Sequence, residues 1–109
     1  MLRPGAIPQA RINAMIEEAT VDAYDLAEQM GGFFTMIEQY LACPFRTDIL
    51  GQPVTALRVD MNQDGQIVAL CSTGRRRQAI PILDLPLPVP PPPGADWIAA
   101  YRYWLKQTG

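Results

Sequence analysis

The stretch PVTALRVDMNQDGQIVALCSTGRRRQAIPIL, residues 53–83, decides the fold of this 109-residue chain. Its apolar and polar residues alternate with the period of two that is typical of half-buried strands. Turn-forming residues interrupt the alternation at 62–65 and at 72–74, and the dipeptide Asp64-Gly65 supplies the positive φ that a tight hairpin needs. The pattern therefore predicts three short antiparallel strands near residues 54–60, 66–72 and 76–83, with room for a fourth near 48–51.

The residues before this stretch have a helical period instead. An apolar stripe with i, i+3, i+4 spacing predicts one helix over about residues 10–30 with a buried face. Gly31-Gly32 predicts a kink or a stop, after which helical spacing resumes until Pro44, which ends it. The predicted stripe consists of Ile12, Met15, Ile16, Ala19, Ala23, Leu26 and Met30.

The residues after the strands begin with a proline-rich segment, 86–94. Its prolines fix φ and remove backbone donors, which predicts an extended polyproline II strap. The strap is either a semi-rigid connector or a ligand for a domain that reads PxxP motifs. A last helix is predicted over 95–106, and its aromatic residues indicate that it docks on the core through Trp97 and Trp104.

Together these patterns predict an α+β fold in one domain, residues 1–109. A flexible N-terminus is expected at 1–9, helices over 10–43 and strands within 46–85. The N-terminal helices would pack on a small SH3-like antiparallel barrel or a highly curved sheet, with the C-terminal helix beside them.

Composition narrows the function classes. A hydrophobic content of 49% with 18% charged residues is typical of a soluble globular protein. The net charge of −2 and the pI near 4.9 argue against a nucleic-acid partner. The first eight residues contain two prolines and no continuous apolar run, so we expect neither a secretory signal nor a membrane partner, and a cytoplasmic location.

The residue types that usually carry catalysis are scarce. The chain has no histidine, one serine and two cysteines, Cys43 and Cys71, which are too far apart in sequence for a CxxC site. Nucleophile pairs that need histidine are therefore excluded, and nothing in the sequence marks a carboxylate as a buried general acid or base. We expect no enzymatic activity, no catalytic residue and no organic cofactor.

Carboxylates follow one flank of the predicted first helix. Glu18, Asp22, Asp25 and Gln29 have i, i+4, i+7 and i+11 spacing, and no basic residue lies between Arg11 and Arg46. Such a surface suits a hard cation such as calcium, although one helix presents ligands in only one row, so other segments or water must complete a site. The alternative is an acidic, solvated helix face.

A second candidate site is the loop between the first two predicted strands. Its pattern D-x-N-x-D-G-x-I, beginning at Asp60, matches the first eight positions of an EF-hand loop. The match fails at position twelve, which is Cys71 instead of glutamate, and strands flank the loop where an EF-hand has helices. Asp60, Asn62 and Asp64 are thus either weak, hydrated calcium ligands or the polar tip of a plain hairpin.

The order of several motifs resembles the small bacterial calcium-binding proteins of the cyanobacterial type. These motifs are R-I-x-x-x-I, V-D-A-Y-D-x-x-E-Q followed by G-F-F, C-P-F, R-x-A-I-P-I and Y-R-Y-W, and they extend from about Arg11 to Trp104. The resemblance implies helices with a small barrel, calcium binding by acidic side chains and no catalysis. Its most specific element carries over Asp22, Asp25 and Glu28, whereas Leu26-Ala27 stand where the family has acidic residues, which implies lower affinity.

Two functions therefore remain open. One is low-affinity calcium binding or buffering, with ligands from Glu18, Asp22, Asp25 and Glu28 and from the Asp60 loop. The other is a non-enzymatic protein-interaction module that has lost calcium binding. The module would use the barrel rim, Arg75 to Arg77 and the proline strap to bind a protein partner.

Overall fold

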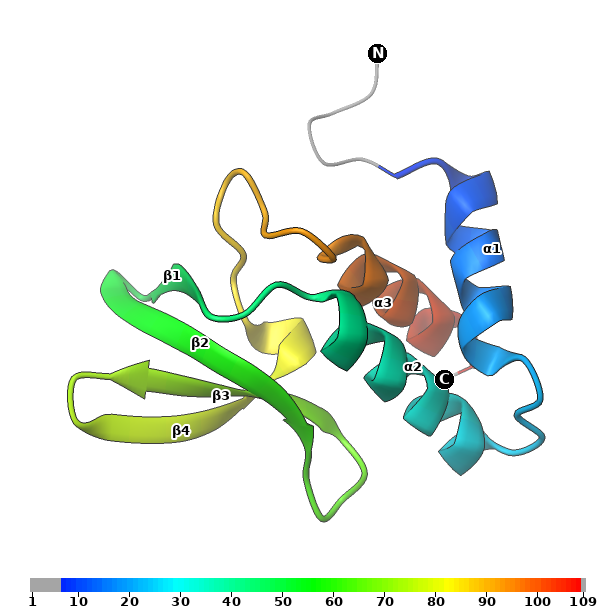
Figure 1. The fold of residues 1–109 in the computed structure, drawn as a ribbon, viewed down its shortest axis with the longest axis horizontal. Helices are drawn as coiled ribbons and strands as arrows, with labels where there is room; N and C mark the ends of the chain where they lie inside the picture. Colours follow the sequence, from blue (N-terminus) through cyan, green and yellow to red (C-terminus); the bar gives the residue numbers. More distant parts are fainter. Residues whose placement is uncertain (1–6, 109) are drawn as a thin grey trace.

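The computed structural model describes residues 7–108, which form three α-helices, a four-stranded antiparallel sheet and a short 3₁₀ helix (Figure 1). The helices gather on one side of the molecule and the sheet extends to the other. The fold is thus α+β, as predicted. Most of the N-terminal segment predicted to be flexible, 1–9, lies outside the described residues, and Gln9 already belongs to the first helix.

The sheet has the order β1-β2-β3-β4, with each strand antiparallel to its neighbour. Because β1 and β4 lie at opposite edges and do not pair, the sheet is not closed into a barrel. Three strands occur where alternation predicted them, and the fourth is β1, slightly earlier than expected. Their bounds are β1 Phe45–Ile49, β2 Gln52–Met61, β3 Ile67–Thr73 and β4 Arg76–Pro81.

The last strand is shorter than predicted. β4 ends at Pro81, and Ile82–Asp84 form the 3₁₀ helix η1 instead of continuing to residue 83 as a strand. Ile82 is almost completely buried, and so is Leu85. Leaving the sheet at Pro81 allows the chain to bury these two side chains in the main core, which offsets the lost strand pairing.

Two helices replace the single one predicted over 10–30. α1 spans Gln9–Thr20 and α2 spans Leu26–Tyr40, so the chain turns at residues 21–25. A stop at Gly31-Gly32, one of the two outcomes predicted for these residues, is wrong as well, because both glycines lie inside α2, which continues to Tyr40. The apolar stripe had the right period, but it crosses a corner between two helices that pack on each other.

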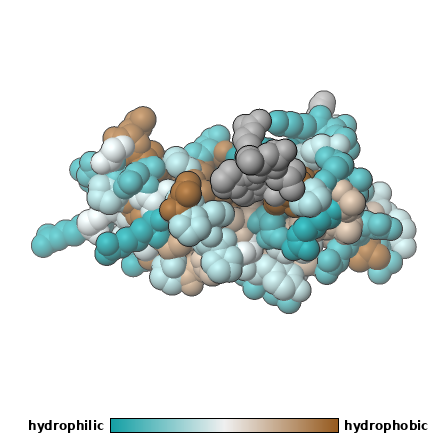
Figure 2. Space-filling model, turned by 90° about the horizontal axis from the view of Figure 1, so that it is seen from above, coloured by the Kyte–Doolittle hydropathy of each residue, from teal (hydrophilic) through white to brown (hydrophobic). Residues whose placement is uncertain are grey.

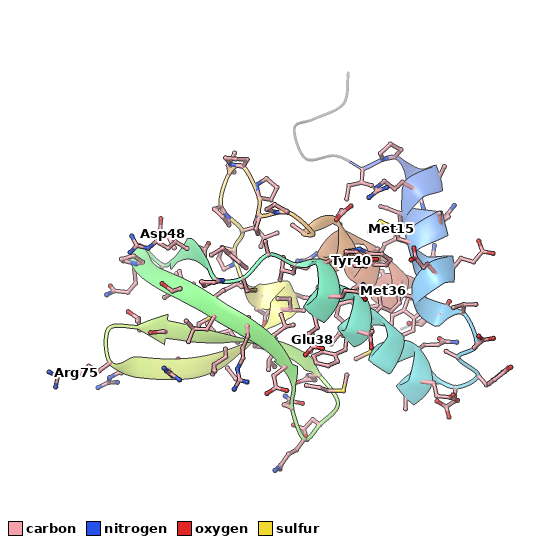
Figure 3. All side chains as sticks on the ribbon, in the orientation of Figure 1. Met15, Met36, Glu38, Tyr40, Asp48 and Arg75 are labelled. Atoms are coloured by element: carbon pink, nitrogen blue, oxygen red, sulfur yellow. The ribbon has the colours of Figure 1, made fainter. Side chains whose placement is uncertain are left out.

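The core joins all three helices to one face of the sheet. α3, Asp96–Thr108, docks through Trp97 and Trp104 as predicted. The ring of Phe33 on α2 lies 4.9 Å from that of Trp104 and 5.5 Å from that of Tyr101 between ring centroids. Such aromatic pairs contribute beyond the area that they bury. Figure 3 shows Met15, Met36 and Tyr40 in this helical half of the molecule.

The proline-rich segment runs from η1 to α3 without forming a helix or strand. Two hydrogen bonds attach it: the Thr47 hydroxyl donates to the Pro86 carbonyl oxygen at 2.6 Å, and the Ala42 amide donates to the Pro93 carbonyl oxygen at 2.9 Å. The segment therefore ties β1 and the end of α2 to α3, as the connector interpretation predicts. Within residues 7–108, no helix combines the length and the apolar composition that a membrane span requires.

Candidate functional site

The acidic stretch forms the corner between α1 and α2. α1 ends at Thr20, whose hydroxyl donates to the Ile16 carbonyl oxygen at 2.8 Å. The Ala23 amide then donates to the Thr20 carbonyl oxygen at 3.1 Å, which turns the chain through Asp22, where φ is 61°. Aspartate tolerates this left-handed conformation better than most residues. We call residues 21–28 the acidic corner.

The second helix begins because Asp25 caps it. Asp25 has an extended backbone, and its Oδ1 accepts a hydrogen bond from the Glu28 amide at 2.8 Å. The first amides of a helix lack partners within it, and an aspartate at this position satisfies one of them. The pair Asp25 and Glu28, three residues apart, also resembles a capping box. That signal for a helix start was present in the sequence, but the apolar stripe that crosses the corner concealed it.

The predicted flank of Glu18, Asp22, Asp25 and Gln29 on one helix is therefore wrong, because these residues are divided between α1, the turn and α2. Glu18 lies on α1, Asp22 in the turn, Asp25 at the cap and Glu28 in the first turn of α2. All four are exposed. Within the described part of the chain, the one ion pair joins Arg11 to Asp96 at 2.7 Å, so no described basic side chain neutralises the corner.

The corner does not contain a preformed metal cage. Among residues 7–108, no group of three or more histidine, cysteine, aspartate or glutamate side chains is close enough to hold a metal ion. A cation that bound here would have at most two of these side chains as ligands and would keep much of its water. Such a site has low affinity, because calcium affinity depends on the number of charged ligands and on site rigidity.

The corner also exposes large apolar side chains, which no sequence pattern predicted. Val21, Tyr24 and Leu26 are 65%, 86% and 61% exposed. Leu26 was predicted to belong to the buried stripe, and that prediction is wrong, because residue 26 begins a new helix with a different orientation. A leucine in the apolar stripe of an amphipathic helix is usually buried. The exposure of Leu26 could therefore be inferred only after the break between the two helices was known.

Figure 2 shows how apolar and hydrophilic residues are distributed on one face of the molecule. Apolar residues appear there as separate brown patches among hydrophilic ones, and single exposed apolar residues are normal on soluble proteins. The acidic corner differs because three large apolar side chains occur within six residues of one loop and helix start.

The loop between β2 and β3 is built as a hairpin turn. Asn62 Oδ1 accepts hydrogen bonds from the amides of Asp64 and Gln66, both at 2.9 Å. Asp60 Oδ1 accepts from the Met61 amide at 2.8 Å, and Gly65 has a φ of 77°. Both lone pairs of the Asn62 oxygen are thus used by the backbone. A cation could bind this oxygen only by competing with those amides.

The hairpin tip and the acidic corner are separate places in the fold. In Figure 1 the β2–β3 turn projects below the sheet, whereas the α1–α2 turn lies at the end of the helical half. The structure therefore does not bring Asp60, Asn62 and Asp64 to the acids of the corner. The seven predicted metal ligands therefore form two separate groups, one around the α1–α2 turn and one around the β2–β3 turn.

The two cysteines are free thiols, with Cys71 buried and Cys43 partly buried. Burial raises the pKa of both thiols, and the nearby Cys43 raises that of Cys71 further. A raised pKa reduces the thiolate fraction, which is the reactive form. Neither environment activates a nucleophile.

Comparisons with models of known protein families, with curated proteins and with solved structures found no match to this chain.

Proposed function

We propose that this protein binds calcium ions weakly and without catalysis, through the carboxylates of the acidic corner. One observation carries the proposal: none of residues 21–28 is buried, although these residues hold the most specific part of the resemblance to small bacterial calcium-binding proteins. Burial in the core therefore does not account for these acids, and capping of α2 accounts for Asp25 alone, so we assign Asp22 and Glu28 a role at the surface.

The shape of the corner favours a cation more than a straight helix would. Its carboxylates come from a turn residue, a cap residue and the first turn of α2, which gives them different directions of approach. Calcium accepts irregular oxygen shells, whereas magnesium requires a strict octahedron and loses water reluctantly. Calcium should therefore bind better than magnesium.

Two features keep the affinity low. One oxygen of Asp25 already accepts a hydrogen bond from the Glu28 amide, and the positive end of the α2 dipole repels a cation near the helix start. We expect a dissociation constant of about 10⁻⁴ to 10⁻³ M, the range of weak calcium sites.

The test is a calcium titration followed by backbone amide NMR shifts. Calcium should shift amides within residues 18–29 of the unmodified protein, and the double variant Asp22→Asn with Asp25→Asn should lose these shifts. Asparagine caps helices about as well as aspartate does, so α2 should stay intact while two charges are removed.

The matched control is Asp48→Asn, which removes an exposed charge from β1, far from the corner (Figure 3). Its calcium response should equal that of the unmodified protein. Absence of shifts at residues 18–29 with ~5 mM calcium, well above the weak-site range, would overturn the proposal.

A second candidate function is protein binding at the same corner, favoured by the exposure of Val21, Tyr24 and Leu26. Aromatic and aliphatic side chains of this kind provide the anchors of protein interfaces. The surrounding carboxylates would select a basic partner surface.

This candidate is tested with a photoreactive phenylalanine analogue at position 24 and, as the control, at position 50, where Leu50 is even more exposed. A discrete crosslinked product from position 24 alone, lost when Leu26→Asp is added, would support protein binding. Equal products from both positions would indicate nonspecific contact and would count against it.

A further inference from the structure

The outer edge of the sheet at β4 is open. β4 is the last strand in the sheet order, and it pairs on one side only, with β3. Residues 76–79 are all exposed, and β3 is the only element with which β4 makes extensive contacts in the described chain. One row of backbone donors and acceptors on β4 therefore faces solvent, which is the property that allows a further strand to add.

An apolar groove lies beside this edge. Gln78 and Ile80 of β4 are paired with Cys71 and Ala69, which face the core, so they lie on the same face of the sheet. With Ile49 of β1 and Val54 of β2 they line a hollow of about 230 Å³ that extends across the four strands to β4. The helices do not fill this end of the sheet face, as Figure 1 shows. A strand added at β4 would direct every second side chain toward the groove.

The edge is strongly basic although the chain as a whole is acidic. Arg75 is in the turn before β4, and Arg76 and Arg77 begin the strand. Within residues 7–108 none of the three forms an ion pair, and Figure 3 shows the Arg75 side chain extending away from the body. Charged residues on an edge discourage nonspecific pairing. Because these residues are arginines, they also favour a partner strand that carries acidic side chains.

We propose that β4 accepts an extended acidic segment of a partner protein as a fifth strand, with alternate apolar side chains in the groove of Ile49, Val54 and Ile80. The backbone bonds of strand addition supply affinity, and the groove and the arginines supply selectivity. A second copy of the chain fits less well, because it would bring three more arginines to the same edge. This surface is independent of the acidic corner, which lies at the other end of the molecule.

The test uses the full chain and a ten-residue peptide of alternating glutamate and valine. The first control is a peptide of the same composition in an order that breaks the alternation. The alternating peptide should shift amides at 49–54 and 76–81 and leave 18–29 unchanged, and it should bind at least five times more tightly than the control.

Three variants locate the site. Arg76→Glu with Arg77→Glu should weaken binding at least tenfold, and Ile80→Ser at least fivefold, whereas Arg46→Glu on β1, the opposite edge, should change it less than twofold. The arginines are exposed, so their replacement preserves the fold even if Ile80→Ser does not. Equal binding of both peptides would mean that charge alone causes the binding, and this result would overturn strand addition. Shifts confined to β1, no binding at millimolar peptide, or concentration-dependent dimers through β4 would overturn it as well.

Discussion

Gly32 on α2 packs directly against the backbone carbonyl of Ala19 on α1. A Cβ built at position 32 would overlap the Ala19 oxygen, whereas one built at the adjacent Gly31 has no neighbour within 4 Å. The two consecutive glycines of α2 thus have different roles. Position 32 allows the two helices to approach, and position 31 only weakens the helix.

The corresponding substitutions should change stability in opposite directions. Gly31→Ala should raise the free energy of unfolding by about 0.5–1 kcal/mol, because glycine is a poor helix former. Gly32→Ala should lower it by about 1–3 kcal/mol, since the clash is with backbone that cannot rotate away. Urea denaturation of the two variants measures this. Stabilisation by both alanines would mean that α1 does not pack closely at this point.

Elements with local sequence signals could be predicted, whereas contacts between elements could not. The strands within residues 54–81, the Gly65 turn and α3 were predictable because their signals are local: alternation, a positive φ and an amphipathic period. The role of Gly32 depends on a second helix, which no local pattern reveals. The break at residues 21–25 was concealed because Ala23 and Leu26 continue the apolar period across it.

The candidate site was predictable in composition and not in arrangement. The sequence identified the acids of residues 18–28 and of the 60–64 loop, and they are exposed. Their relation to one another depends on the α1–α2 turn, which distributes them over two helices and a loop. The exposure of Tyr24 and Leu26 follows from the same turn.

The β1–β2 turn should be open to stabilisation. Leu50 and Gly51 form its two central residues, with φ of 51° and 77°, and Leu50 is fully exposed. A left-handed conformation costs an ordinary residue about 1–2 kcal/mol, and asparagine tolerates it better. Leu50→Asn should therefore raise the free energy of unfolding by about 1 kcal/mol.

The control for this substitution is Val89→Asn. It also replaces an exposed apolar residue, but at a position without a positive φ, so it should change stability by less than about 0.5 kcal/mol. Thermal and urea denaturation distinguish the two effects. An equal gain in both variants would attribute it to surface polarity instead of turn geometry.

Stability should fall at alkaline pH because of the two thiols. Burial raises the pKa of Cys43 and Cys71 in the folded state. The contribution of these thiols to stability is therefore fully present at pH values below the thiol pKa of the unfolded chain, about 8.5. As pH rises beyond that value, the unfolded chain releases its thiol protons first, and stability is lost until the folded thiols ionise too. Burial raises the pKa of Tyr101 as well, which extends the loss to higher pH.

Replacing both cysteines by alanine should flatten this dependence between about pH 8 and pH 10, the range just above the ordinary thiol value. The measurement is urea denaturation across that range with a reductant present. The variant will be less stable at every pH, because Cys71 is buried. The prediction is therefore tested by the slope of the free energy of unfolding against pH and not by its absolute value. An unchanged slope would show that the thiols ionise equally in both states.

The β2–β3 loop should behave as a turn rather than as a cation site. Asn62→Ala removes the acceptor of two backbone amides and should cost about 1–2 kcal/mol, and Gly65→Ala should cost about 1 kcal/mol because its φ is positive. Asp60→Ala should be nearly silent, because the hydrogen bond that its carboxylate accepts from the Met61 amide is exposed to solvent.

The melting temperatures of these proteins with and without calcium distinguish the two interpretations of this loop. If the loop is only a turn, calcium will change the melting temperature of the unmodified protein and of Asp60→Ala equally. If the loop holds the ion, calcium will stabilise the native state through preferential binding, and this gain will shrink in both Asp60→Ala and Asp64→Ala. We expect the first outcome, because the Asn62 oxygen that would face the ion already accepts the amides of Asp64 and Gln66.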